Sequence, residues 1–403
     1  MSSATAVRTA LGAFGLTLVG ASPPFVLGAI APFLLAELEM APEQFGVGVA
    51  AFFAASALCS FGGGAVALRF GPRRSMALAA ALGIAAMVSV GTWVSSFPAL
   101  VAMLALAGAS NGLGQPASNT AIAANVPLRR RALAMGIKQG AIPLGGALSG
   151  LSVPIIAMPF GWRWSVLLVV VVGAALVVAT PRIAALPTRP MGARPGRMPD
   201  RFRWLLAVAV VGLLGAAGAT ALGAFLVTAL VAENGYPPSD AALLVMAGSV
   251  AAFGIRIVLG MVVDRFSVSP FLLIGGLLAL SSACFLALGT GSTAVVLALA
   301  AVLGLLATSG WQGLFQFGVV QQDPIDPARA TGVTQSGMFF GAFAGPLVFG
   351  LVASSVGFGP SWLGLAVTSG IGTLTVFAVA LHARRRRSEP DTFPDLARAD
   401  IRA

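Results

Sequence analysis

The chain has 403 residues, of which 58% are hydrophobic and 9% are charged. A water-soluble domain of this length cannot bury so much apolar surface, so most of the chain must lie in lipid. The formal net charge of +11 does not indicate a nucleic-acid-binding protein, because the arginines lie in short segments between long apolar runs. The two cysteines, Cys59 and Cys284, lie within such runs and indicate neither a disulfide nor a metal site.

The apolar runs are each long enough to cross a bilayer, which takes about 20 residues in a helix. Transmembrane β-strands would alternate in polarity and extend over about 10 residues, so the runs indicate helices. The expected spans are residues 10–36, 44–68, 74–94, 97–125, 132–158, 163–180, 204–232, 241–263, 269–289, 293–319, 330–355 and 361–382. The predicted fold class is all-α, a polytopic membrane protein with twelve transmembrane helices. We expect the first run to be retained, because the N-terminus lacks a charged n-region and a small-residue cleavage site.

The second half of the sequence repeats features of the first half at an offset of 196 residues, as from position 139 to position 335. Ala134, Gly136, Gln139 and Gly145 recur as Ala330, Gly332, Gln335 and Gly341, and Gly64, Arg69 and Phe70 recur as Gly260, Arg265 and Phe266. Two unrelated landmarks that share one offset indicate an internal duplication of about half the chain. We therefore expect two pseudo-symmetric six-helix bundles.

Composition sets the expected boundaries of these parts. The N-terminal bundle is residues 1–180 and the C-terminal bundle is residues 204–387. Residues 181–203 are rich in proline and arginine, so we expect a solvated cytoplasmic linker there. Residues 388–403 are polar and are expected to form a disordered cytoplasmic tail.

The arginines lie on one side of the expected topology. They follow the second, fourth, sixth, eighth and tenth spans and recur in the C-terminal tail, whereas the opposite side holds Arg163 with several acidic residues. The positive-inside rule then places both termini and the linker in the cytoplasm. We expect an integral protein of the bacterial inner (plasma) membrane.

Two loops carry a related motif. The loop after the second span reads GAVALRFGPR from Gly64 to Arg73, and the loop after the eighth span reads GMVVDRF from Gly260 to Phe266. With twelve spans in a 6+6 duplication and a long basic central loop, the chain resembles the major facilitator superfamily of secondary transporters, whose first such loop carries G-x-x-x-D-R-x-G-x-R. Leu68 stands in place of the acid in the first copy.

The resemblance implies a gating motif made of Gly64, Arg69, Gly71, Arg73, Gly260, Asp264 and Arg265. In the superfamily, the acid of this motif helps to latch the two halves together when the cytoplasmic side is closed. Leu68 cannot do this, so we expect the role to rest on Asp264. The resemblance also implies transport by alternating access.

Polar side chains inside the spans are candidates for substrate binding, because they are costly in a membrane and because such transporters bind substrate near the midplane between their repeats. We select Asn111, Gln115, Lys138, Gln139, Arg256, Trp311, Gln312 and Gln335. Lys138, the only lysine, lies seven residues after Arg131, so its amine could instead extend to the cytoplasmic headgroups. Arg256 could be structural near the gate, and the amides could form hydrogen bonds between helices.

Ionisable acids are absent from the middle of every expected span, and the sole histidine, His382, lies at the end of the last span. A proton-coupled carrier usually needs a buried carboxylate or histidine, so the sequence indicates no coupling ion. Two buried positive charges without counter-charges make sense if the substrate supplies the negative charge. Arg256 resembles the basic residue that certain anion carriers of the superfamily have on their eighth span. The predicted substrate is a small organic anion, a carboxylate.

Two other functions stay open. Efflux of drugs or other apolar or cationic compounds is one, because the segment GAIPLGG resembles a glycine–proline motif of antiporters, and a non-transporting sensor is the other. Nucleotide loops, nucleophile–base pairs and metal-ligand clusters are missing at useful spacing, so we predict no enzyme, no cofactor and no metal. We expect a monomer whose partners are the small-molecule substrate and bilayer lipids, with no nucleic acid.

Overall fold

The computed structural model describes residues 3–40, 42–178, 198–266, 268–291, 293–324 and 326–388, and it confirms the predicted all-α fold for this part of the chain. The first half contains α1 (Ser3–Ala21), α2 (Pro23–Ala29), α3 (Ala31–Glu37), α4 (Pro42–Phe70), α5 (Pro72–Thr92), α6 (Phe97–Asn125), the 3₁₀ turn η1 (Leu128–Arg130), α7 (Arg131–Ser152), the π-helical turn η2 (Val153–Ala157), α8 (Met158–Phe160) and α9 (Trp162–Val178). The second half contains α10 (Met198–Ala232), α11 (Pro238–Phe266), α12 (Pro270–Gly289), α13 (Ala294–Gly310), α14 (Gln312–Gln322), α15 (Pro327–Val356) and α16 (Phe358–Ser388).

Within the described residues, nine helical segments are long and apolar enough to cross a membrane. They correspond to the second, third and fourth expected spans and to all six of the second half. The first expected span is divided into α1, α2 and α3, because Pro23 and Pro24 remove backbone donors after Ala21. The fifth is divided at Pro154, and the sixth is the 17-residue helix α9. Pro116 and Pro143, in contrast, lie inside continuous helices.

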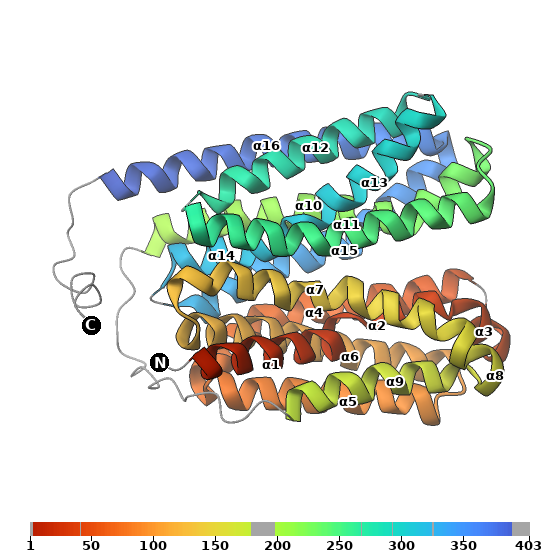
Figure 1. The fold of residues 1–403 in the computed structure, drawn as a ribbon, viewed down its shortest axis with the longest axis horizontal. Helices are drawn as coiled ribbons and strands as arrows, with labels where there is room; N and C mark the ends of the chain where they lie inside the picture. The colour runs from red at the N-terminus through yellow and green to blue at the C-terminus, as the bar shows by residue number, and fades with distance from the viewer. Residues whose placement is uncertain are drawn as a thin grey trace.

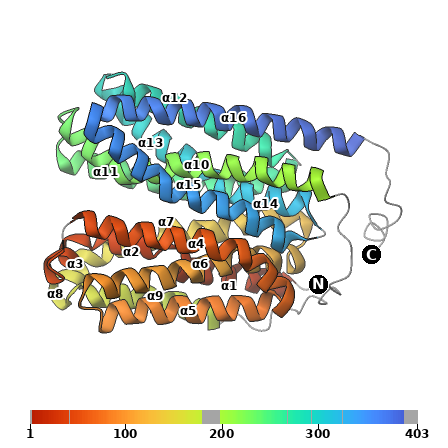
Figure 2. The same ribbon diagram turned by 180° about the vertical axis from the view of Figure 1, so that it is seen from behind.

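The helices form two bundles that lie side by side (Figures 1 and 2). Helices α1 to α9 form one bundle and helices α10 to α16 form the other. The start of α1, the start of α10 and the end of α16 lie at the same end of the molecule (Figure 1). Residues 181–197 and 389–403, which cover most of the expected linker and tail, lie outside the described residues, and α10 already begins at Met198.

Close helix packing holds the second bundle together. A Cβ atom at Gly337, Gly341 or Gly345 would collide with the backbone of α10 between residues 209 and 217. Glycines four residues apart form one stripe on a helix, so α15 approaches α10 more closely than larger side chains would allow. Stacked rings fill the same bundle further along, as between Phe285 and Trp362 at 6.0 Å between centroids.

Polar contacts close the first bundle at the end away from the start of α1. Arg163, at the start of α9, forms an ion pair with Glu37 at 2.7 Å and donates to the backbone oxygens of Val90 and Val94. The indole of Trp162 donates to the same carboxylate at 2.6 Å. These contacts join α3, α9 and the C-terminal end of α5.

The two bundles contact each other along several pairs of helices. Helix α4 packs against α15, and α7 packs against α11 and α14. Hydrogen bonds cross the first pair, from Ser60 Oγ to the oxygen of Gly332 at 3.3 Å and from Ser336 Oγ to the oxygen of Ala57 at 2.8 Å. The repeated helices α7 and α15 therefore each contact the opposite bundle.

Candidate functional site

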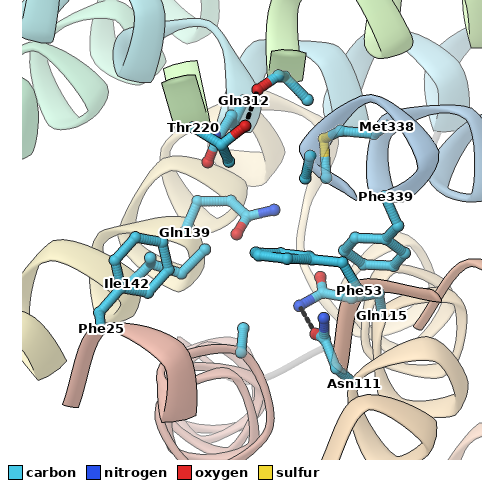
Figure 3. A pocket seen from close by; sticks show the side chains of 13 residues that line it. Phe25, Phe53, Asn111, Gln115, Gln139, Ile142, Thr220, Gln312, Met338 and Phe339 are labelled. Carbon is cyan, nitrogen blue, oxygen red and sulfur yellow. Dashed lines mark hydrogen bonds between the residues drawn. The ribbon is translucent and has the colours of Figure 1, made fainter. Parts of the chain in front are cut away.

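A cavity of about 60 Å³ lies between the two bundles. It is several times larger than the roughly 10–15 Å³ that one water molecule requires. The first bundle contributes Ala21, Phe25, Phe53, Asn111, Gln115, Gln139 and Ile142 to its wall, and the second contributes Ala216, Thr220, Gln312, Met338, Phe339 and Ala342 (Figure 3). Four of the predicted substrate-binding residues are in this wall, namely Asn111, Gln115, Gln139 and Gln312.

Lys138 is fully buried behind this wall. Its Nζ atom donates to Oε1 of Gln115 at 2.7 Å, to Oδ1 of Asn119 at 2.5 Å and to Oε1 of Gln316 at 3.1 Å. An ammonium group has three donors and no acceptor, and here each donor has an amide oxygen as its partner. The amine thus points into the protein, and the structure contradicts the alternative in which it extends to the lipid headgroups.

A directional chain of hydrogen bonds continues from Lys138. Gln115 Nε2 donates to Asn111 Oδ1 at 3.2 Å, and Asn111 Nδ2 donates to Ser56 Oγ at 3.2 Å. Ser56 Oγ in turn donates to the backbone oxygen of Phe52 at 2.8 Å. Because an ammonium can only donate, the oxygen of Gln115 must face Lys138 and its NH₂ group must face away. Aligned hydrogen bonds of this kind polarise one another.

Arg256, the second buried cation, is 3% exposed and also lies behind the wall. Its Nε atom donates to the backbone oxygen of Ser309 at 3.0 Å, its Nη1 atom to the backbone oxygen of Gln139, and its Nη2 atom to Oε1 of Gln312 at 3.0 Å. The guanidinium group joins α11 to α13, α7 and α14. It also fixes the amide of Gln312 with its oxygen toward the cation, which leaves the NH₂ group for the cavity.

The cavity wall therefore presents oriented amide donors. Among the described residues, the hydrogen-bond partners of Lys138 and Arg256 include no carboxylate. Gln139 is 1% exposed and its Oε1 atom has no hydrogen-bond partner within the described chain. Figure 3 shows its amide extending into the space between the aromatic side chains. A ligand in this cavity would meet the NH₂ groups of Gln115 and Gln312, which are backed by two buried positive charges, and the unpaired amide oxygen of Gln139.

Asp264, the acid of the predicted gating motif, binds across the two bundles. Its Oδ1 atom accepts from the backbone N–H of Ala132 at 3.1 Å, and its Oδ2 atom accepts from that of Leu133 at 2.8 Å. These N–H groups belong to the first turn of α7, where they lack partners within the helix and where the helix dipole favours a negative charge. A Cβ atom at Gly260, one turn earlier, would lie 2.8 Å from Leu133 Cα, so only glycine permits this approach.

The first copy of the motif makes the corresponding approach without the acid. A Cβ atom at Gly64 would lie 2.5 Å from the backbone oxygen of Ala328, at the start of α15. Leu68 is 43% exposed and cannot cap this helix. Asp326, the N-cap residue of α15, accepts from the backbone N–H of Arg329 at 3.1 Å instead. The helix thus carries its own acidic cap, whereas α7 receives one from the opposite bundle.

The remaining motif residues lie at the surface. Arg69, Arg73 and Arg265 are exposed, and the guanidinium groups of Arg69 and Arg265 lie over the ring of the following phenylalanine at 5.5 and 5.8 Å. Gly71 has a φ of 80°, which favours glycine and turns the chain from α4 into α5. No hydrogen bond from these three arginines joins the two bundles within the described residues.

Besides Lys138 and Arg256, two further predicted substrate-binding residues lie outside the cavity wall. Trp311 is fully buried, and its ring packs against Gly215 of α10 and meets Phe315 edge to face at 5.3 Å. Gln335 is fully buried and donates from Nε2 to Gln115 Oε1 at 3.5 Å, so it contacts the polar cluster from behind. The position of Trp311 gives no support to the prediction that it binds substrate.

The sequence alone did not identify the apolar part of the wall. Phe25, Phe53, Ile142, Met338 and Phe339 lie in spans where most residues are apolar. An apolar residue in such a span can face lipid, another helix or a cavity, and composition does not distinguish these environments.

Helices long enough to cross a membrane and a cavity between two helix bundles are an arrangement typical of membrane transporters. The family model described as Major Facilitator Superfamily matches residues 12–321 and 208–403. The chain belongs to this superfamily, whose members are transport proteins rather than enzymes.

Three relatives have known or suggested substrates. The chain is 26% identical to the 3-(3-hydroxy-phenyl)propionate transporter of Escherichia coli (strain K12), over 81% of this chain and 82% of that protein. It is 28% identical to the hexuronate transporter of Bacillus subtilis (strain 168), over 36% of this chain and 35% of that protein. It is 32% identical to the probable anion transporter 2, chloroplastic, of Oryza sativa subsp. japonica, over 33% of this chain and 25% of that protein. The latter two matches thus span about a third and a quarter of the relatives.

Solved structures with the same fold include two transporters of different substrates. A human organic anion transporter, TETRAN, superposes with a TM-score of 0.69 at 18% identity, over 92% of this chain and 97% of that one. A proton:xylose symporter, XylE, superposes with a TM-score of 0.77 at 16% identity, over 94% of this chain and 96% of that one. At these identities the likeness shows the fold alone.

Proposed function

We propose that the protein moves a small organic anion, a carboxylate, across the membrane by alternating access. The observation that carries this proposal is the orientation of the cavity amides. Lys138 and Arg256 bind the oxygens of Gln115 and Gln312, which turns the NH₂ groups of these side chains away from the cations and leaves them to donate to a ligand. A carboxylate accepts hydrogen bonds from such donors and is the ligand group that fits them best.

Electrostatics supports the same ligand. A buried cation is costly unless an opposite charge or several hydrogen bonds compensate it. In the described structure the two cations have amide and carbonyl partners, which satisfy their donors but leave the positive charges in place. An anion that enters the cavity supplies the missing negative charge. An amine would meet two positive charges instead, so the cavity is less suited to cationic drugs.

The relatives support an anionic substrate as well. The hexuronate, hydroxyphenylpropionate and chloroplastic anion transporters all carry names that denote anions. The identities are low, and two of the matches cover a minor part of those proteins. The names agree with the chemistry of the cavity.

The surroundings of the protein follow from the same proposal. We assign it to the bacterial inner membrane as a monomer, with both termini and the linker between the bundles in the cytoplasm. The exposed arginines Arg69, Arg73 and Arg265 lie at the ends of helices α4 and α11 and the start of α5, which supports this orientation. We divide the chain into a first bundle of residues 1–180 and a second bundle that begins with α10 at Met198 and ends with α16 at Ser388, in place of the expected bounds 204 and 387.

The melting temperature of the purified protein tests the proposal. A ligand that binds the folded state stabilises it by about 2.7 kcal/mol at a hundred times its Kd. We expect carboxylates to raise the melting temperature, and amines and neutral compounds of equal size to leave it unchanged. Counterflow of the stabilising anion in proteoliposomes then distinguishes a carrier from a sensor. Stabilisation by amines and not by carboxylates would favour drug efflux.

A further inference from the structure

Apart from its amides, the cavity is lined by large apolar side chains. Figure 3 shows the rings of Phe53 and Phe339 on one side of the cavity, and Phe25 with Ile142 on the other. Met338 lies next to Phe339. The rest of the wall consists of three alanines and of the polar side chains of Asn111, Gln115, Gln139, Thr220 and Gln312. The site thus combines amide hydrogen-bond donors with an apolar surface formed by large side chains.

The two rings on the first side are held in place by their neighbours. Phe53 is 9% exposed, and its ring meets the fully buried ring of Phe52 edge to face at 5.1 Å. Phe339 is 5% exposed on α15. Helices α4 and α15 come from opposite bundles and pack against each other, so both bundles contribute one ring to the same side of the cavity. At about 60 Å³ the cavity is smaller than the roughly 150 Å³ cavity that holds a benzene ring in another protein, so these surfaces must move apart to admit an aromatic ring.

These surfaces favour some carboxylates over others. A sugar acid carries a hydroxyl on most carbons, and each hydroxyl buried against a phenyl ring without a partner lowers affinity. A dicarboxylate would place its second charge in the apolar part. An aromatic ring gains both from burial and from offset or edge-to-face contacts with other rings.

We propose that the transported anion is an aromatic monocarboxylate. Its ring lies between Phe53 and Phe339 on one side and Phe25 on the other, and its carboxylate lies at the amides of Gln115 and Gln312. This inference rests on the proposed function, because it requires an anion. It adds the chemical class of the apolar part of the ligand, to which the carboxylate is attached.

Binding of small ligands to the purified full-length protein tests the apolar part and the charge of the ligand separately. The probes are 3-phenylpropionate, hexanoate, glucuronate and succinate, together with the uncharged 3-phenylpropan-1-ol and the cation phenethylamine. We expect 3-phenylpropionate to bind about tenfold more tightly than hexanoate, which corresponds to one to two aromatic contacts. Equal or tighter binding of hexanoate, glucuronate or succinate overturns the aromatic class and leaves the anion proposal intact. Binding of the alcohol or the amine without binding of any acid overturns both.

Matched variants locate the ring. Phe339→Leu keeps an apolar side chain and should remove most of the preference for 3-phenylpropionate over hexanoate. Phe340→Leu, at the next position, changes a 53% exposed side chain and should keep the preference. Because the readout is a ratio of two affinities in one folded variant, a general loss of stability does not imitate it. An unchanged ratio in both Phe339→Leu and Phe53→Leu would overturn the placement of the ring and the inference with it.

Discussion

Replacing Lys138 with glutamine removes the positive charge behind the cavity while keeping a polar side chain. Lys138 does not line the cavity, so its effect on a bound carboxylate must pass through Gln115. The distance from Nζ to Gln115 Oε1 is 2.7 Å, and the amide group with one more hydrogen bond adds about 5 Å. A carboxylate oxygen on the far side of Gln115 is then roughly 7–8 Å from the ammonium.

The magnitude follows from Coulomb's law. At an effective dielectric constant of about 20, two unit charges at this distance attract by about 2 kcal/mol. Loss of the charge should therefore weaken carboxylate binding roughly thirtyfold. The amide of Gln115 should also lose its fixed orientation, because glutamine at position 138 can donate or accept. Both effects lower affinity for an anion, and neither lowers affinity for an uncharged ligand.

Equilibrium binding of the carboxylate that stabilises the wild type is the assay, with the substrate-free melting temperature measured alongside. Arg74→Gln serves as the control, because it removes one exposed positive charge away from the cavity. We expect Lys138→Gln to lose affinity and Arg74→Gln to keep it. Wild-type affinity in Lys138→Gln, with a folded protein, would refute the argument that this cation acts on the ligand through the amides.

Three further outcomes are expected. Asp264→Asn should slow initial uptake, at matched protein level, several-fold more than Leu68→Ala. The reason is that the carboxylate binds two N–H groups of α7, and one charge-assisted hydrogen bond contributes about 1.5–3 kcal/mol. Equal effects of the two substitutions would contradict the role of Asp264 as a latch. Arg256→Lys should lower the affinity for the carboxylate about tenfold, because an ammonium cannot reach the three partners of the guanidinium at once. Wild-type affinity in this variant would show that a positive charge alone suffices. Burial raises the pKa of Glu37, but the hydrogen bonds from Arg163 and Trp162 and the charge of Arg163 lower it by more, so its net pKa is below the ordinary 4.5. Because the pKa of Glu37 is lower in the folded state, its ionised carboxylate stabilises the fold above pH 4.5, and this contribution is lost as the pH falls through the folded-state pKa. The melting temperature should therefore fall more steeply below pH 4.5 in the wild type than in Glu37→Gln. Parallel curves for the two proteins would contradict this.

The sequence was enough to select most of the polar side chains that the structure places in or behind the cavity wall, although it did not single out Thr220. A charged residue in an apolar span is rare and costly, so Lys138 and Arg256 stand out without any structure. The geometry of Asp264 agrees with the interaction that we expected from the repeated loop. The acid that replaces the missing one, Asp326, could have been recognised from its place directly before a helix.

Other features depended on contacts that the sequence does not display. Lys138 and Gln115 are 23 positions apart on different helices, and their hydrogen bond exists only once α6 and α7 are packed. Trp311 resembled a binding residue because it lies among polar residues, but its ring packs against a glycine of α10. The division of the first span at Pro23 shows that long apolar runs predict a crossing of the membrane better than a single unbroken helix.

The layer of amides between the cations and the cavity suits a carrier that must return empty. A cation that directly lined the cavity would lack a partner whenever the anion left, and a buried unpaired charge is costly. Here the three donors of Lys138 are bound by amide oxygens of the protein itself. The same layer limits affinity, because the carboxylate interacts with the charge over about 7–8 Å rather than in a direct ion pair. On the proposed mechanism, the amides let the protein attract an anion, release it on the other side and reverse without exposing an unsatisfied charge.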